Sequence, residues 1–214
     1  MITNKPFIVN NVTFPYIYWD EFFSELELNA IEDYCKNIES GELTNLGGLI
    51  GRPINTSEDT NDMRKSEGKF INPGPDNQWM FDKLNMITSH VNNNFFNYEL
   101  LGYESIQYTE YNKKGDKYGW HIDMIFGDSD LKDDRSTGGG FIIPRKLSFS
   151  LILSDTSTYK GGEFEIDVGG RVQIAEQKRG RVIAFPSYIK HQVTPIKSGV
   201  RKSIVWWVLG PKFK

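Results

Sequence analysis

The stretch Tyr111-Asn-Lys-Lys-Gly-Asp-Lys-Tyr-Gly-Trp-His-Ile-Asp123 runs from an aromatic strand pattern, through a turn, into a His-x-Asp tripeptide. Successive side chains of a strand point to opposite faces, so the side chains of His121 and Asp123 point the same way. The tripeptide alone is weak evidence, since such a pattern arises often by chance. A metal site here also needs a ligand from a distant strand.

The chain has three histidines, and His191 lies in a second strand-like segment, followed by Arg201. Two imidazoles and one carboxylate occupy one face of a ferrous ion and leave the other positions open for a cosubstrate and O2. His121, Asp123 and His191 are therefore the candidate metal ligands and catalytic centre. His90 falls within a predicted helix, where we expect a structural histidine.

Two more segments carry a family resemblance. One is Arg145-Lys-Leu-Ser-Phe-Ser-Leu-Ile-Leu-Ser154 with the turn Tyr159-Lys-Gly-Gly-Glu-Phe164, and the other is Gly180-Arg-Val-Ile-Ala-Phe-Pro-Ser-Tyr-Ile-Lys-His191-Gln-Val-Thr-Pro-Ile-Lys-Ser-Gly-Val-Arg201. Over roughly residues 100 to 210, about half of the chain, the sequence resembles the prolyl 4-hydroxylase-like branch of the Fe(II)/2-oxoglutarate-dependent dioxygenases.

The resemblance implies a cofactor set and two cosubstrate-binding residues. The cofactors are Fe(II), 2-oxoglutarate as cosubstrate and O2, with ascorbate as a candidate reductant. An Arg ten residues after the second ligand His binds the distal carboxylate of 2-oxoglutarate in the family, and Arg201 stands ten residues after His191. Tyr111 stands ten residues before His121, where the family uses a Tyr.

The chain reads as one catalytic domain over residues 1–214, with no repeat and no second domain. Ser24-Glu-Leu-Glu27 is a capping box, which predicts a helix over about 24–39, and an apolar stripe predicts a second helix over about 77–94. Residues 1–100 are thus expected to supply helical support and loops, with a loop over 40–62. From about 103 the period becomes two, and the resemblance implies a double-stranded β-helix over 101–210, jelly-roll-like and buttressed by the helices.

The strand from residue 147 has one face of Leu147, Phe149, Leu151 and Leu153, and a more polar opposite face. That polar face consists of Ser148, Ser150, Ile152 and Ser154. It is either exposed to solvent, as is common in antiparallel sheets, or, as the resemblance implies, Ser148, Ser150 and Ile152 lie along the cosubstrate pocket.

In the last strand Arg201, Ser203, Val205 and Trp207 share a face, and we count Ser203 and Val205 among the cosubstrate residues. Arg201 would then point into a largely apolar interior, where an unpaired guanidinium is costly. The distal carboxylate of 2-oxoglutarate is one suitable partner because a planar guanidinium binds it bidentately. The alternative is an ion pair with a protein acid such as Glu163 or Glu165. Tyr111 is alternatively an ordinary cross-strand aromatic.

Composition and charge bear on the partners and the cellular compartment of the protein. A formal charge of −3 and a pI near 5.7 disfavour nucleic acid as a partner. One cysteine, Cys35, fits a reducing compartment and burial in a helix. No signal peptide and no apolar run of about 18 residues appears, so we expect a cytoplasmic protein without a membrane partner. The oligomeric state stays open.

By resemblance, the reaction is hydroxylation of an unactivated C–H bond with conversion of 2-oxoglutarate to succinate and CO2. A peptidyl proline is the leading substrate. The polar, glycine-rich loop over 127–143 is either a lid that clamps a peptide or a merely solvated loop. A free amino acid or other small molecule is the alternative substrate. A non-catalytic jelly-roll binding protein is the alternative of another class.

Overall fold

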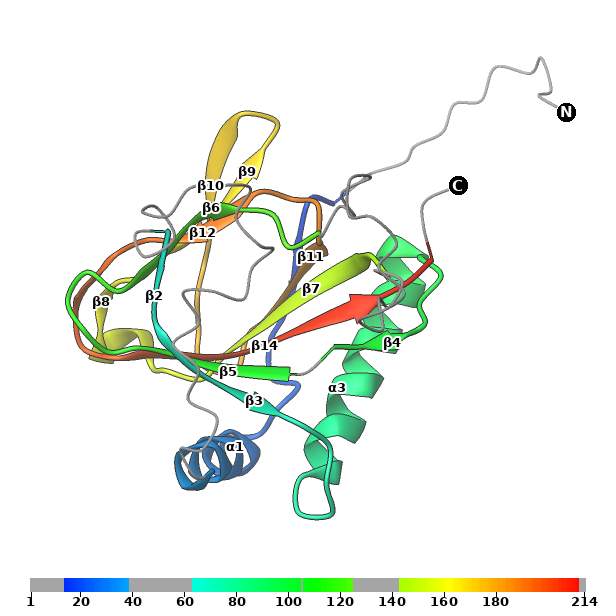
Figure 1. The fold of residues 1–214 in the computed structure, drawn as a ribbon, viewed down its shortest axis with the longest axis horizontal. Helices are drawn as coiled ribbons and strands as arrows, with labels where there is room; N and C mark the ends of the chain where they lie inside the picture. Colours follow the sequence, from blue (N-terminus) through cyan, green and yellow to red (C-terminus); the bar gives the residue numbers. More distant parts are fainter. Residues whose placement is uncertain (1–13, 39–62, 105, 125–142, 212–214) are drawn as a thin grey trace, which may run out of the picture.

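The computed structural model describes residues 14–38, 63–104, 106–124 and 143–211. Two antiparallel β-sheets face each other, and two helices cover the outer side of the larger one (Figure 1). The predicted loop over 40–62 and most of the predicted lid over 127–143 lie outside the described residues.

The larger sheet has seven strands in the order β1-β11-β7-β14-β5-β3, with β4 paired to β14. Their bounds are β1 (Ile17–Trp19), β3 (Glu67–Ile71), β4 (Gly102–Tyr103), β5 (Ile106–Tyr111), β7 (Arg145–Ile152), β11 (Val182–Pro186) and β14 (Arg201–Leu209). One face of this sheet looks into the interior between the two sheets, and both helices pack on its other face.

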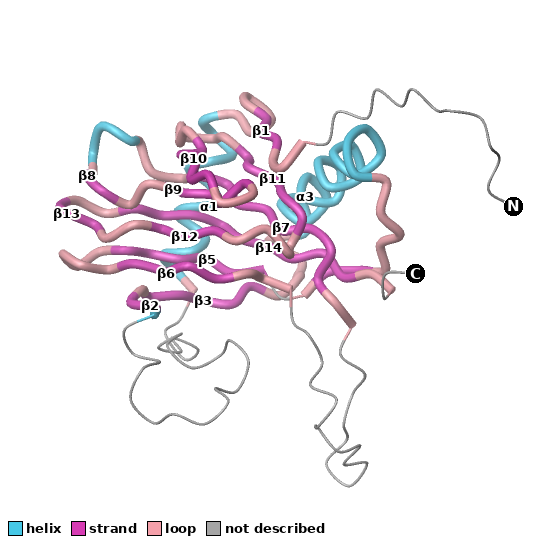
Figure 2. The backbone as a smooth tube through the Cα atoms, turned by 90° about the horizontal axis from the view of Figure 1, so that it is seen from above, coloured by secondary structure: helices cyan, strands magenta, loops and turns pink. Residues whose placement is uncertain are grey.

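The smaller sheet has five strands in the order β10-β9-β12-β6-β2. These are β2 (Arg64–Lys65), β6 (Lys117–His121), β9 (Phe164–Val168), β10 (Arg171–Ala175) and β12 (His191–Val193). A separate pair joins β8 (Lys160–Gly161) to β13 (Ile196–Ser198). Figure 2 shows β8 and β13 at one end of the strands and the second long helix toward the other. The jelly-roll-like prediction is confirmed.

The two predicted helices are α1 (Glu25–Asn37) and α3 (Gln78–Val91), and α3 continues into a π-helical turn, η3 (Asn92–Phe96). A short 3-10 turn, η5 (Thr156–Thr158), precedes β8. The capping box is present: the Glu27 amide donates to Ser24 Oγ at 3.3 Å, and the Ser24 amide donates to Glu27 Oε2 at 2.8 Å. Two donors at the start of α1 are thereby satisfied.

The alternation within β7 and β14 separates two hydrophobic clusters. The outward face of the larger sheet packs on the helices, with the side chains Leu147, Phe149, Leu151, Leu153, Ile204, Trp206 and Val208 against Leu28, Ile31, Met80 and Leu84. Trp206 Nε1 also donates to Thr88 Oγ1 on α3 at 3.0 Å. The inward face looks toward the smaller sheet, so the helices act as the predicted buttress and leave the interior free for a site.

Cys35 belongs to the helix-side cluster, where its side chain is fully buried. Burial raises the pKa of its thiol to about 12, so the thiol stays protonated. The expected role as a small apolar residue is confirmed.

The first hundred residues contribute more than helices and loops. They supply β1 and β3 to the larger sheet and β2 to the smaller one. These short strands carry little periodic signal and form only by pairing with distant strands, which is why sequence patterns missed them. Among the described residues, no helix is long and apolar enough to cross a membrane.

Candidate functional site: two histidines and one carboxylate

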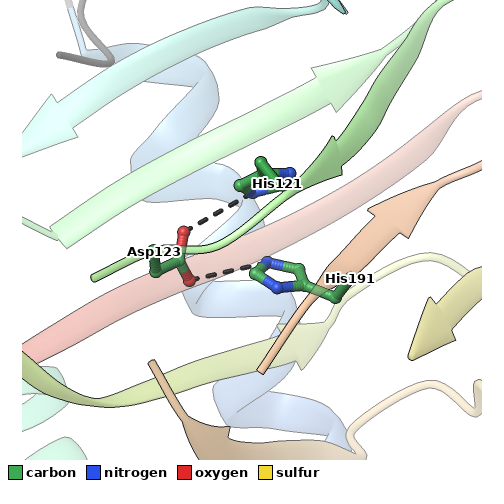
Figure 3. Close-up of side chains that lie close together, drawn as sticks. All are labelled: His121, Asp123 and His191. Carbon is green, nitrogen blue, oxygen red and sulfur yellow. Dashed lines mark ion pairs between the residues drawn. The ribbon is translucent and has the colours of Figure 1, made fainter. Parts of the chain in front are cut away.

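Three side chains from two paired strands converge in the interior. His191 on β12 lies directly opposite His121 on β6 in the antiparallel register, and Asp123 follows β6 by two residues. The Nε2 atoms of His121 and His191 lie 3.5 Å from Oδ1 and Oδ2 of Asp123, respectively (Figure 3). The candidate ligand atoms all lie within 4.8 Å of one another.

The second nitrogen of each imidazole is already occupied. Nδ1 of His121 lies 2.7 Å from the Gly119 carbonyl oxygen, and Nδ1 of His191 lies 2.9 Å from that of Ile189. Because a carbonyl oxygen only accepts, each Nδ1 carries the proton and donates. Each Nε2 then turns a lone pair toward the carboxylate, as metal-binding histidines do.

Burial sets the charges of this cluster. His191 and Asp123 are 5% and 7% exposed. Burial lowers the pKa of His191 to about 4, so its imidazole is neutral at neutral pH. Burial alone would raise the pKa of Asp123, but the two histidines in their protonated forms and the Arg145 guanidinium lower it well below its usual range. The site therefore presents a neutral imidazole and a carboxylate, the protonation states that bind metals.

The arrangement fits a divalent cation. The lone pair of His191 Nε2 faces a carboxylate oxygen across 3.5 Å with no proton between them. Two acceptors that face each other in a buried space repel, and a cation between them would satisfy both. The two-nitrogen, one-oxygen donor set is the one that iron enzymes use and leaves coordination positions open.

Aromatic rings fix the orientation of the two imidazoles. The Tyr118 ring stacks on His121 with ring centroids 3.5 Å apart, and Phe185 meets His191 edge-on at 4.6 Å. His90 is elsewhere, on the exposed side of α3, in edge contact with Trp19 at 4.5 Å. His90 therefore has the structural role that its helix position predicts.

A pocket opens beside this cluster between the two sheets. Its walls combine ring and aliphatic side chains with a few polar groups, namely Arg64, Gln107, Thr109, Tyr111, Tyr118, Phe149, Ser150, Phe164, Phe185, Val193, Arg201, Ser203, Val205 and Trp207, besides the three candidate ligands. A mostly apolar cleft with few convergent polar groups is typical of a small-molecule site.

Arg201 lies deep in this pocket and is only 1% exposed. Its Nε donates to Oε1 of Gln177 at 2.8 Å and its Nη1 donates to Oγ of Ser203 at 3.3 Å. The guanidinium carbon lies 5.3 Å from the ring centre of Tyr111, which is opposite Arg201 in the β14–β5 register.

The protein acids considered as partners of Arg201 are engaged elsewhere. The Glu163 carboxylate accepts from the Thr194 hydroxyl, and the Glu165 carboxylate accepts from Gln192 Nε2 at 2.6 Å. No carboxylate of the described residues forms an ion pair with Arg201. The alternative of an internal ion pair is therefore wrong within this part of the chain.

The polar face of β7 divides between pocket and core. Ser150, Ser203 and Val205 line the pocket, as expected. Ser148 and Ile152 do not: the Ser148 hydroxyl pairs with that of Ser187 at 2.9 Å, and Ile152 packs in the inter-sheet cluster. Ser148, Ser150 and Ile152 are all buried, so the alternative of a solvent-exposed face is wrong.

Several residues of the site were not among those predicted from the sequence. Gln107 and Thr109 share the face of Tyr111, so strand alternation could have found them. Arg64 comes from the two-residue strand β2. Gln177, which bonds to Arg201 and is not itself a lining residue, follows β10 by two residues. Neither carries a sequence signal, because only long-range pairing brings them to the site.

Arg145 contacts a residue of the pocket wall and the backbone of Asp123. Its guanidinium is paired with Glu104 and lies 4.1 Å from the ring centre of Trp207, and its Nη1 donates to the Asp123 carbonyl oxygen at 3.4 Å. The wall of the pocket is thus tied to the backbone of a candidate ligand.

One segment of the chain is similar to known proteins. Residues 106–209 match the family model of the 2OG-Fe(II) oxygenase superfamily. A PKHD-type hydroxylase of Synechococcus sp. (strain CC9902) is 37% identical over 94 residues, and one of Hyphomonas neptunium is 37% identical over 98 residues. These alignments cover 44% of this chain and 36% and 38% of the relatives, so the matched region spans little more than a third of each relative.

Solved structures show the same fold over nearly the whole chain. A Pseudomonas putida prolyl-4-hydroxylase superposes with a TM-score of 0.67 at 18% identity, covering 92% of this chain and 94% of that one. A Trichoplax adhaerens prolyl hydroxylase, in complex with a hypoxia inducible factor peptide fragment, superposes with a TM-score of 0.68 at 17% identity. That superposition covers 91% of this chain and 83% of the Trichoplax chain. Residues 106–209 thus resemble the 2OG-Fe(II) oxygenase superfamily, and the chain has the fold of the prolyl hydroxylases in these solved structures.

Proposed function

We propose that the protein is an Fe(II)- and 2-oxoglutarate-dependent dioxygenase that hydroxylates an unactivated C–H bond, with a peptidyl proline as the leading substrate. The observation that carries this proposal is the pairing of two features in one pocket. One is the buried cluster of His121, Asp123 and His191, and the other is Arg201, a buried cation without a protein carboxylate partner among the described residues. A metal would fit the three-residue cluster, and an anionic cosubstrate would pair with Arg201.

Each group of residues has a distinct task in this proposal. Bound iron, 2-oxoglutarate and O2 supply the oxidising chemistry and release succinate and CO2. His121, Asp123 and His191 would hold the metal, and Arg201 would bind the distal carboxylate with help from the hydroxyls of Ser203 and Tyr111. Ser150 and Val205 would line the same cosubstrate space.

The remaining walls exclude water. Phe164 and Phe185 form an apolar side of the pocket in contact with His191. A dry wall strengthens the interaction of Arg201 with a carboxylate and protects a reactive centre from side reactions. Ascorbate is proposed as an accessory reductant that keeps the metal ferrous.

A peptide substrate is supported by the relatives rather than by the pocket itself. The Trichoplax adhaerens neighbour is described with a bound peptide fragment, and further neighbours are described as prolyl hydroxylases. We also propose that the chain acts as a single catalytic domain, because β1, β2 and β3 from its first half pair with strands of its second half.

A small-molecule substrate with an anionic group is the second candidate, and Arg64 favours it. Arg64 is 7% exposed and lines the pocket, with Nη2 donating to Gln107 at 2.8 Å and Nε donating to Ser66 at 3.0 Å. No carboxylate of the described residues pairs with Arg64. A free amino acid carries a carboxylate that this guanidinium could bind.

The test starts from purified protein loaded with Fe(II) under anaerobic conditions. Admission of O2 with 2-oxoglutarate should release succinate, and a panel of proline peptides and free amino acids should show which substrate gains one oxygen atom by mass spectrometry. Oxygen gain in a peptide supports the leading substrate, and gain only in an amino acid supports the second. Absence of both succinate and 2-oxoglutarate binding would contradict the dioxygenase proposal.

A further inference from the structure

The guanidinium of Arg201 is held by neutral partners. Its Nε and Nη1 donate to the Gln177 amide oxygen and the Ser203 hydroxyl, and the third contact is the Tyr111 ring. Within the described part of the chain, Nη2 donates to no protein acceptor. Since none of these partners carries a negative charge, Arg201 keeps its full charge and the N–H groups of Nη2 for a ligand.

Gln177 is fixed at both ends of its amide. Nε2 donates to the Gly162 carbonyl oxygen at 2.8 Å, while Oε1 accepts from Arg201 Nε. A carbonyl oxygen cannot donate and a guanidinium cannot accept, so the orientation of this amide has only one solution. Gln177 therefore orients Arg201 through an uncharged contact.

Tyr159 brings a hydroxyl to the same place. A Cβ built on Gly162 would lie 3.0 Å from Arg201 Cδ and 3.5 Å from Tyr159 Cε2, so the Arg201 side chain and the Tyr159 ring approach the same point. Tyr159 is 7% exposed, and its buried hydroxyl has no hydrogen-bond partner among the described residues. Burial raises the pKa of this hydroxyl, against a lowering by Arg201, so it remains a donor at neutral pH.

We propose that Gln177 and Tyr159 complete the Arg201 subsite for the distal carboxylate of 2-oxoglutarate. Gln177 is a positioning residue that presents the guanidinium without neutralising it. Tyr159 is a binding residue whose hydroxyl donates to the carboxylate that Arg201 binds. The identity of the ligand rests on the proposed function, whereas the unpaired charge and the unpartnered hydroxyl are features of this chain.

The proposal predicts opposite effects on stability and on binding. An acid in place of Gln177 would pair with Arg201 and neutralise its charge, but it would lose the hydrogen bond to the Gly162 carbonyl oxygen. The new ion pair offsets the lost bond, so Gln177→Glu should leave the ligand-free protein about as stable as the wild type. Tyr159→Phe removes a buried hydroxyl that has no partner, which should also spare ligand-free stability. Both variants should nevertheless bind 2-oxoglutarate more weakly.

The experiment measures binding in the presence of Mn(II), which fills the metal site without turnover. The melting temperature is recorded without 2-oxoglutarate, and the dissociation constant of 2-oxoglutarate is obtained by titration calorimetry. Weakening should reach about 10- to 100-fold for Gln177→Glu and about 5- to 20-fold for Tyr159→Phe. Gln173→Glu makes the same charge change on the exposed side of β10 and should match the wild type.

Two results would overturn the proposal. One is wild-type affinity for 2-oxoglutarate, within twofold, in both variants. The other is a loss of ligand-free melting temperature together with affinity, which would show that the two residues only support the fold. If the wild type itself does not bind 2-oxoglutarate while Mn(II) binds, the proposed function fails instead, so the two failures are distinguishable.

Discussion

His191 Nε2 and Asp123 Oδ2 lie 3.5 Å apart with no hydrogen between them, because the proton of His191 is on Nδ1 and points to the Ile189 carbonyl oxygen. In a buried site this contact between two acceptors is unfavourable until a cation occupies the space. The geometry of these two side chains thus favours a bound cation.

Replacement of His191 by Ala should abolish metal binding and turnover. Loss of a group that merely orients a metal ligand already costs roughly 10- to 100-fold in affinity, and loss of a ligand should cost more. Mn(II) titration followed by electron paramagnetic resonance measures the affinity. His90→Ala, on the exposed side of α3, is the matched control and should bind as the wild type does. Retained affinity in His191→Ala would show that this ligand assignment is wrong.

Replacement of Arg201 by Ala should raise the apparent KM for 2-oxoglutarate while the protein stays folded. A hydrogen bond to a charged group contributes roughly 1.5–3 kcal/mol, and a bidentate pair contributes more. Folding should survive because no ion pair with a described residue is broken. Tyr111→Phe should cause a smaller rise. An unchanged saturation curve for Arg201→Ala would contradict the role of this residue.

Local patterns were sufficient to predict the elements that position the candidate ligands. The tripeptide His121-Ile122-Asp123 brings two groups to one side because of strand geometry, and the alternation from Arg201 to Trp207 separates the pocket face of β14 from its core face. The start of α1 was predictable because Ser24 and Glu27 can form the reciprocal hydrogen bonds of a capping box.

Sequence patterns could not predict the parts of the site that depend on pairing between distant residues. Arg64 reaches the pocket because β2 pairs with β6, although only two residues of β2 take part. Gln177 lies 24 positions from Arg201 in the sequence, in an irregular segment without periodicity. Ser148 has the same period as Ser150 but finds a partner in Ser187, which alternation along one strand cannot reveal.

Asp20 should contribute pH-dependent stability. Arg181 donates to both of its carboxylate oxygens, at 2.7 and 2.8 Å, and so ties the end of β1 to the start of β11. Hydrogen bonds from Arg181 hold the pKa of Asp20 below its ordinary value of 3.8. Because the folded-state pKa is lowered, the contribution is complete above pH 3.8 and is lost as pH falls through the folded value.

Asp20→Asn should therefore lower the free energy of unfolding by about 1–3 kcal/mol at pH 7, since the 6% exposed Arg181 side chain loses its bidentate partner. Urea unfolding at pH 7 and at successively lower pH measures the difference. The gap between the wild type and the variant should narrow below about pH 4. A gap that stays constant or widens toward acid pH would contradict the assigned partner.

Gly162→Ala should lower both the stability of the protein and its affinity for 2-oxoglutarate. Gly170→Ala should lower the stability alone, through backbone strain. Both glycines have positive φ, at +67° and +87°. A Cβ on Gly162 would lie 2.6 Å from Ile196 Cδ1 and 3.0 Å from Arg201 Cδ, but a Cβ on Gly170 would meet nothing within 4 Å. Both variants place an alanine in a left-handed backbone conformation, but only the Gly162 variant also forces a methyl group against neighbouring side chains.

The expected loss of stability is about 1–2 kcal/mol for Gly170→Ala, from the left-handed backbone alone. Gly162→Ala should lose about 1–3 kcal/mol more, because the added methyl group must displace neighbouring side chains. Displacement of Arg201 should also weaken 2-oxoglutarate binding in Gly162→Ala and leave it unchanged in Gly170→Ala, as measured by calorimetry with Mn(II). Equal stability losses, or wild-type affinity in Gly162→Ala, would show that the close approach of Gly162 to Arg201 does not shape the pocket.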